Sequence, residues 1–196
     1  MKHVLYALLT AVSILFTSCG PSSNTNNPQV PNVPQPQPQP QPEVTQKVVI
    51  GYLALDDWEF ENLFPTIEWK YLTHINASFA RVKADGTLNI NPVRKRIESV
   101  RETAHKHNVK ILISLAKNSP GEFTTAINDP KARKELIQQI IAFTKEYKLD
   151  GFDIDYEEYD NWDKNFPSLL VFARGLYLAK EKNMLMTCAV NSRWLN

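Results

Sequence analysis

Short apolar runs rich in β-branched residues alternate along the chain with stretches of helical periodicity, and this alternation limits the possible folds. Two of the expected helices begin with a capping residue followed by proline, at Asn91-Pro92 and at Asp129-Pro130. Strands that alternate with helices indicate a parallel sheet with crossover helices, so a doubly wound sheet and a (β/α)8 barrel both fit. The expected strands are residues 48–55, 72–82, 109–115, 150–157 and 184–190.

Three helices are expected, and the first two carry an apolar stripe at helical spacing, which predicts the faces that pack on the sheet. The first helix begins at Asn91, the second runs from Asp129 to Tyr147, and the third covers residues 167–182. The residues expected to be buried are Val93, Ile97, Val100 and Ala104 on the first helix, and Leu136, Ile137, Ile140 and Ile141 on the second.

The fourth strand, Asp150-Gly151-Phe152-Asp153-Ile154-Asp155-Tyr156-Glu157, carries acids at alternating positions. Side chains alternate between the faces of a strand, so Asp153, Asp155 and Glu157 share one face and the intervening apolar residues share the other. Same-face positions lie roughly 6 to 7 Å apart, and like charges at that distance, away from bulk water, hold at least one carboxyl protonated. Because a carboxyl that is neutral near pH 7 can act as a general acid, the stretch predicts a catalytic site.

The acidic stretch also fits an exposed acidic strand end or a divalent-ion site. Calcium favours carboxylates that converge from a loop, which an extended strand does not provide. The acids also bear on the fold, because catalytic groups in a (β/α)8 barrel surround the axis at the carboxyl ends of the strands. No glycine-rich phosphate loop follows the first strand, so we predict a barrel rather than a nucleotide-binding sheet.

The amino terminus has the features of an export signal, and we assign residues 1–18 to it. Lys2 and His3 form a short basic region, and the apolar run 4–16 is too short to span a membrane. Small residues that lead into Cys19 resemble a bacterial lipobox, which implies lipidation of Cys19 and a membrane-anchored, exported lipoprotein. An ordinary signal peptide with a chance cysteine is the alternative. The second cysteine, Cys188, is expected to be a small core residue.

Residues 19–46 form an expected disordered tether, because the Pro-Gln alternation of residues 34–42 cannot build a packed core and favours an extended polyproline II conformation. A PxxP-type docking ligand is the alternative function of this segment. The folded domain is therefore expected to cover residues 47–196. With 22 basic and 21 acidic residues, the chain has a formal net charge of +1, which indicates no nucleic-acid partner.

The acidic strand resembles the D-x-x-D-x-D-x-E signature of the family 18 glycoside hydrolases, which include chitinases and endo-β-N-acetylglucosaminidases. Asp150, Asp153, Asp155 and Glu157 fill all four acidic positions. The other matches are Gly51-Tyr52 on the first strand, residues 72–79 on the second and Ile113-Ser114-Leu115 on the third. After the third strand the family usually continues Gly-Gly, whereas this chain has Ala116-Lys117.

The resemblance implies a retaining mechanism without a carboxylate nucleophile. Glu157 would protonate the glycosidic oxygen, and the 2-acetamido carbonyl of the substrate would attack the anomeric carbon, the substrate-assisted exception to two-carboxylate catalysis. Asp155 would hold the acetamido N–H. Asp153, hydrogen-bonded by Tyr52 and Ser114, would tune Asp155.

Further positions are expected to shape the sugar site or the backbone around it. Asp150 and Gly151 are expected to be structural. The family implies a cis peptide bond before Phe79, which would turn that ring into the floor of a sugar subsite. Tyr159 and Trp162 are candidates for stacking on sugar rings, with loop packing as the alternative. No cofactor is expected, and a metal site at His105 and His107 is not, because the two side chains face different ways.

The favoured function is hydrolysis of β-1,4 links next to N-acetylglucosamine, in chitin-type chains or in the N-glycan core. A sugar-binding lectin of the same fold is the alternative, although lectins derived from this family typically lose the acid at the position of Glu157. A complete barrel needs about 250 residues, whereas 47–196 provides about 150, enough for the first five strands. We therefore expect an incomplete barrel of low stability, with open edges at its first and last strands.

Overall fold

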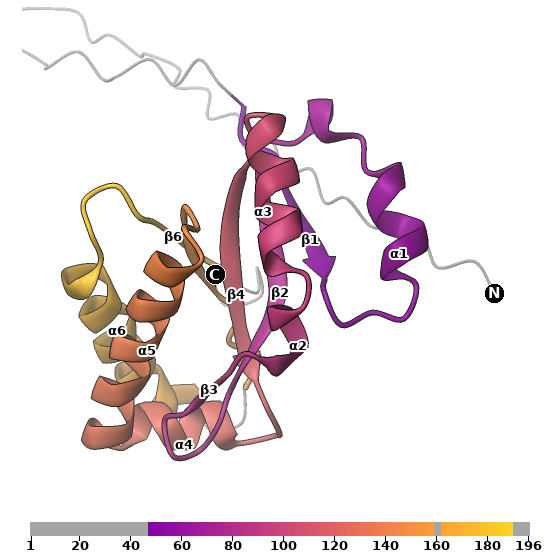
Figure 1. Cartoon of the computed structure of the whole chain (residues 1–196). Helices are drawn as coiled ribbons and strands as arrows, with labels where there is room; N and C mark the ends of the chain where they lie inside the picture. Colours follow the sequence, from indigo (N-terminus) through magenta and orange to yellow (C-terminus); the bar gives the residue numbers. More distant parts are fainter. Residues whose placement is uncertain (1–46, 159–161, 190–196) are drawn as a thin grey trace, which may run out of the picture. The chain divides into compact units, whose positions relative to one another are not determined.

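The computed structural model describes residues 47–158 and 162–189. The predicted signal segment 1–18, the tether with Cys19, and Tyr159 lie outside the described residues. Parallel strands form one sheet in the order β1-β2-β4-β5-β6, and the short strand β3 pairs antiparallel with β2 (Figure 1). The strands are β1 Ile50–Ala54, β2 His74–Val82, β3 Leu88–Asn89, β4 Lys110–Lys117, β5 Gly151–Ile154 and β6 Leu185–Cys188.

Helices connect the parallel strands, which confirms the predicted partial (β/α)8 barrel. In Figure 1, α3 lies alongside β4, and α5 and α6 lie side by side near the edge of the sheet that β5 and β6 form. The helices are α1 Phe60–Leu63, α2 Asn91–Arg94, α3 Ile97–Lys106, α4 Glu122–Asn128, α5 Pro130–Glu146 and α6 Trp162–Ala179, with 3-10 turns η1 Phe64–Thr66 and η2 Trp69–Tyr71.

The main core lies between the sheet and these helices, as the alternation of side chains predicts. Phe152 and Ile154 of β5 are fully buried there, and the predicted stripe Val93, Ile97, Val100 and Ala104 is fully buried as well. Leu136 and Ile140 of α5 are buried, whereas Ile137 and Ile141 are only partly buried. The predicted stripe of α5 therefore packs on the core, with Leu136 and Ile140 at its centre and Ile137 and Ile141 at its margin.

The predicted helix from Asn91 is interrupted and forms α2 and α3 instead. The break falls at Arg96, whose guanidinium turns back to donate hydrogen bonds to the carbonyl oxygens of Leu55 (2.6 Å) and Asp57 (3.0 Å). The N-cap position is Ile90 rather than Asn91, so the predicted cap is wrong. The second predicted cap is confirmed, because the Asp129 side chain accepts a hydrogen bond from Ala132 N at 2.7 Å.

Three further expectations about the last elements need correction. The strand predicted over 150–157 ends at Ile154, so Asp155 and Glu157 follow the strand. Helix α6 begins at Trp162, five residues before the predicted start, and contains Pro167. Cys188 is an exposed free thiol rather than a core residue, because β6 is an edge strand of the sheet within the described part of the chain.

Both edges of the sheet carry strands with a single neighbour among the described residues, as expected. Ile50 on β1 is exposed, and so are four large apolar side chains of α6: Leu170, Val171, Tyr177 and Leu178. Across 47–158 and 162–189, no helix combines the length and the apolar character needed to cross a bilayer.

Gly151 begins β5 where the strand passes close to β6. A Cβ atom at this position would overlap the backbone carbonyl group of Leu185, whereas a Cβ at Gly51 would meet only side chains, those of Leu72 at 3.4 Å and Ile75 at 3.9 Å. We expect Gly151→Ala to lower the free energy of unfolding by about 1–3 kcal/mol, because the backbones of β5 and β6 must separate. Gly51→Ala is the matched control, and urea denaturation measures both. Equal stability of the two variants would contradict the close approach of β5 and β6.

Candidate active site

A buried carboxylate, that of Asp153, lies at the centre of the predicted site. Its side chain is 1% exposed and sits in register with Ser114 on β4 and Thr187 on β6. Asp153 Oδ2 accepts hydrogen bonds from the Tyr52 hydroxyl (2.8 Å) and Ser114 Oγ (2.7 Å), and Oδ1 accepts one from Thr187 Oγ1 (2.6 Å). The expected contacts with Tyr52 and Ser114 are confirmed.

Thr187 is a contact that the sequence analysis missed. It lies on the predicted fifth strand, at the alternate position that faces the same side as Asp153. A hydroxyl among the apolar residues of that strand was the available signal. Three hydroxyl donors offset much of the cost of burying a carboxylate, because a buried polar group needs hydrogen-bond partners.

Tyr52 reaches Asp153 from β1, which is separated from β5 by β2 and β4 in the strand order. Burial of its hydroxyl group raises the pKa of Tyr52, and the negative charge of Asp153 raises it further. The phenol therefore stays protonated and donates to the carboxylate at every physiological pH. Its ring lies beside that of Phe79, with the two centroids 6.5 Å apart.

Asp155 is half-buried, next to Asp153 on one side and Glu157 on the other. Burial, followed by the charges of Glu157 and Asp153, raises the pKa of Asp155 to about 6. Lys117 and Arg81 act in the opposite direction and lower it. The pKa of Asp155 is thus raised in the predicted direction but not far enough to keep the carboxyl mainly protonated at pH 7, and burial contributes more than the predicted repulsion. With a pKa of about 6, roughly one-tenth of it is protonated at pH 7.

Glu157 is the outermost acid, and 61% of its side chain is exposed. Lys117 Nζ donates a hydrogen bond to the Glu157 carbonyl oxygen (3.1 Å) and lies 4.0 Å from its carboxylate. Lys117 is the residue that follows Ala116 where the family usually has Gly-Gly, so this cation is a feature of the present chain. An exposed carboxyl at the open end of the sheet is accessible to a ligand.

Phe79 follows a cis peptide bond after Ser78, as predicted. The pairing of β2 with β4 shifts between Ala77 and Ala80, around this bond. The Arg81 guanidinium lies 5.0 Å from the centre of the Phe79 ring. Phe79 therefore lies between Tyr52 and Arg81, close to the acidic cluster.

Asp150 lies at the opposite, amino end of β5 and contacts none of the three other acids. It accepts hydrogen bonds from His105 Nε2 (2.8 Å), Lys110 Nζ (2.9 Å) and Ile111 N (2.9 Å). Burial by itself would raise the pKa of Asp150, but these hydrogen bonds lower it overall. This environment is that of a structural ion pair between α3, β4 and the start of β5.

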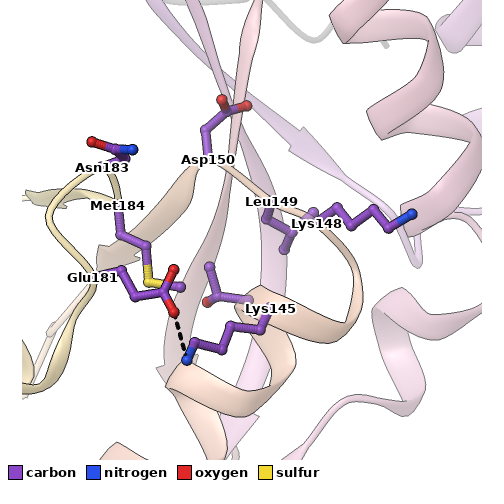
Figure 2. A pocket seen from close by; sticks show the side chains of 8 residues that line it. Lys145, Lys148, Leu149, Asp150, Glu181, Asn183 and Met184 are labelled. Carbon is purple, nitrogen blue, oxygen red and sulfur yellow. Dashed lines mark ion pairs between the residues drawn. The ribbon is translucent and has the colours of Figure 1, made fainter.

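A hollow of about 320 Å³ also opens at this amino end, beside Asp150 (Figure 2). The ion pair between Lys145 Nζ and Glu181 Oε1, 2.6 Å apart, lies across it. Because Asp153 and Glu157 lie at the other end of β5, this hollow is separate from the candidate active site. It is lined by Thr144, Lys145, Lys148, Leu149, Asp150, Glu181, Asn183 and Met184.

The two remaining candidates for sugar stacking are Tyr159, outside the described residues, and Trp162. Trp162 is the first residue of α6, and its side chain likewise lies outside the described part of the chain. Within 47–158 and 162–189, no three His, Cys, Asp or Glu residues gather in a way that would hold a metal ion. The described site therefore consists of carboxyl groups, hydroxyl groups and two cations.

Comparison with known proteins identifies relatives that share this arrangement of elements. A crystal structure of a chitinase from Bacteroides thetaiotaomicron is 99% identical, with a TM-score of 0.75 over 76% of this chain and 48% of that one. A chitinase from Cycas revoluta, solved in complex with (GlcNAc)3, shares the fold at 23% identity, with a TM-score of 0.63 over 72% of this chain and 45% of that one.

Chitinase B of Serratia marcescens is 27% identical over 144 residues, which cover 58% of this chain and 28% of that protein. The chain thus spans about half the length of the solved relatives, and less of the curated one. The family model described as "Glycosyl hydrolases family 18" matches residues 48–193, so the chain belongs to family 18 of the glycosyl hydrolases.

Proposed function

We propose that the protein acts as a retaining glycosidase on β-1,4 links next to N-acetylglucosamine, with Glu157 as the acid. The observation that carries the proposal is the graded acidic cluster at the carboxyl end of β5. Asp153 is buried and accepts three hydrogen bonds, Asp155 has a pKa of about 6, and Glu157 is exposed beside them. General acid catalysis requires a carboxyl within reach of the substrate, and the exposure of Glu157 meets that requirement.

In the proposed mechanism, Glu157 donates its proton to the glycosidic oxygen as the bond to the anomeric carbon breaks. The carbonyl oxygen of the substrate's own 2-acetamido group attacks that carbon from the opposite face and forms a cyclic oxazolinium ion. Asp155 accepts a hydrogen bond from the acetamido N–H and stabilises the positive charge of the oxazolinium ion. Water, deprotonated by Glu157, then opens the ring with the original anomeric configuration.

Asp153 acts on the protonation of Asp155 rather than on the substrate. Burial, the charge of Glu157 and the charge of Asp153 together raise the pKa of Asp155, so that Asp155 can take up or release a proton near pH 6. Tyr52, Ser114 and Thr187 keep the Asp153 carboxylate in place. In this proposal, Phe79 provides an apolar surface next to the cluster on which a sugar ring can stack.

Chitin-type chains are the favoured substrate over the N-glycan core. The solved and curated relatives are named as chitinases, and one of them was crystallised with an oligomer of N-acetylglucosamine. A lectin of this fold is the second candidate. The presence of Glu157 at an exposed position favours catalysis over binding alone.

The first test is Glu157→Gln, which keeps the shape of the side chain and removes the acidic proton that is transferred to the substrate. We expect hydrolysis of a fluorogenic chitobioside to fall by about 10²- to 10⁴-fold. Binding of chito-oligosaccharides, measured by calorimetry, should stay close to that of the wild type. Glu98→Gln on the exposed face of α3 is the matched control. Retention of more than about a tenth of the activity would exclude Glu157 as the acid.

The second test concerns the charge of Asp155. Its folded pKa of about 6 lies above the ordinary value of about 3.9, so its ionisation costs stability as the pH rises from about 4 through 6. Asp155→Asn should therefore stabilise the fold at about pH 7.5, by on the order of 1 kcal/mol because the half-exposed group is screened by solvent. The gain should vanish near pH 4.

Asp150→Asn is a control for this measurement with the opposite sign. The pKa of Asp150 is lowered in the fold, so its ionised form contributes stability above about pH 4 that the amide lacks. Thermal melts between about pH 4 and 8 measure both variants. Equal pH dependence of Asp155→Asn and the wild type would contradict the raised pKa. Asp155→Asn should also slow turnover, mainly of substrates that carry the N-acetyl group.

We further propose that the protein is exported and attached to a membrane through lipidated Cys19, which lies outside the described residues. The sequence before Cys19 supports this proposal. Cys19→Ser should move the protein from the membrane fraction to the soluble fraction of its native host, because a protein without its acyl chains loses membrane affinity. An unchanged distribution on an immunoblot would refute lipid attachment at Cys19.

A further inference from the structure

The segment 155–158 carries both Asp155 and Glu157 but lies beyond the end of β5. Asp155 N still donates to the Leu115 carbonyl oxygen of β4, at 3.0 Å. Beyond this bond, the strand ladder no longer explains the position of Glu157. A carboxyl that must transfer a proton to one particular oxygen needs a defined position, since a displacement of about 1 Å can cost a hundredfold in rate.

Side-chain contacts with the connection between β4 and α4 hold this segment instead. Glu158 Oε1 accepts a hydrogen bond from Gly121 N, and Oε2 accepts one from Thr124 N, both at 2.6 Å. The first N–H groups of a helix lack partners within the helix, and Gly121, at the N-cap position, has no side chain to accept from them. Glu158 supplies the missing acceptor from another part of the chain.

Two neighbouring residues reach the same connection independently of Glu158. The Tyr156 hydroxyl lies 2.6 Å from Thr124 Oγ1, and its buried ring packs edge-on against Phe123, with the centroids 5.5 Å apart. Lys117 Nζ donates to the backbone carbonyl oxygen of Glu157. Three consecutive residues, 156 to 158, are thus each attached to the end of β4 or the start of α4.

We propose that Glu158 is a positioning residue, which fixes the Glu157 carboxyl relative to Asp155 by anchoring the segment 155–158 to the start of α4. This inference rests on the proposed function of Glu157 and adds a group that does not itself touch the substrate. The bond between two backbone N–H donors and one carboxylate is charge-assisted and bidentate, which gives it a defined direction as well as strength. Lys117 is the second anchor, through its hydrogen bond to the Glu157 carbonyl oxygen.

Glu158→Gln tests the anchor, because the amide keeps the size of the side chain but offers only one acceptor oxygen to two donors. Glu135→Gln on α5 is the matched control for the loss of a surface charge. Hydrogen exchange, followed by mass spectrometry on the full chain, should become at least about tenfold faster in the segments 121–124 and 155–158. Exchange in α5 should stay at the wild-type rate in both variants.

Hydrolysis of the fluorogenic chitobioside shows whether the Glu157 carboxyl is correctly positioned. We expect Glu158→Gln to lower kcat by about 10- to 100-fold while KM stays within about twofold, because binding precedes the step that needs the placed acid. A cap that only stabilises α4 would change the melting temperature and leave kcat unchanged. That result, or unchanged exchange in 155–158, would overturn the proposal.

Lys117→Met decides the question if Glu158→Gln does not fold, since it removes the donor to the Glu157 carbonyl oxygen from a partly exposed position. Lys117→Met should also speed hydrogen exchange in 155–158, but by less than Glu158→Gln. If the wild-type chain hydrolyses no chitobioside, the proposed function fails, and the exchange rates alone then support or overturn the anchor.

Discussion

The buried carboxylate of Asp153 is the interaction on which the carboxyl end of this sheet depends. A charge that is 1% exposed is stable only with nearly complete hydrogen bonding, and here the donors are hydroxyl groups of Tyr52, Ser114 and Thr187. They come from β1, β4 and β6, so one side chain of β5 ties three other strands together. Replacement of any donor would leave the charge less satisfied and loosen the contact between strands.

The same charge also contributes to the electrostatics around it. Asp153 raises the pKa values of both Tyr52 and Asp155, although burial is the larger cause for each. Lys117 and Arg81 oppose this effect at Asp155. Since Lys117 stands where the family usually has glycine, this chain adds a cation next to its reactive acids. The cluster therefore combines a fixed anion, a carboxyl that titrates near neutral pH, and a cation that limits how far that carboxyl shifts.

Local patterns predicted the parts of the fold that depend on local rules. Apolar runs rich in β-branched residues located β1, β2 and β4 to within a few residues, and the buried stripe of α3 followed from helical spacing. The failures have tertiary causes. The helix that begins at Asn91 breaks where Arg96 bonds to carbonyl groups of residues 55 and 57. Helix α4, which the sequence did not predict, has a glycine as its N-cap residue, and the N–H of that glycine is bonded by Glu158, 37 residues later. No local window contains those partners.

The acidic strand shows why a motif can locate a site without describing it. All four acids were identified from their spacing, but spacing does not tell how deeply each is buried. Asp150 belongs to an ion-pair network with His105 and Lys110 at the amino end of β5. The exposed fraction rises from 1% at Asp153 to 61% at Glu157, because the chain leaves the sheet between these two residues. A buried acid keeps fixed partners within the protein, whereas an exposed acid is able to contact a substrate that binds and leaves. In the proposed mechanism, the order of the acids along the chain is therefore also the order in which they change from supporting groups to reacting ones.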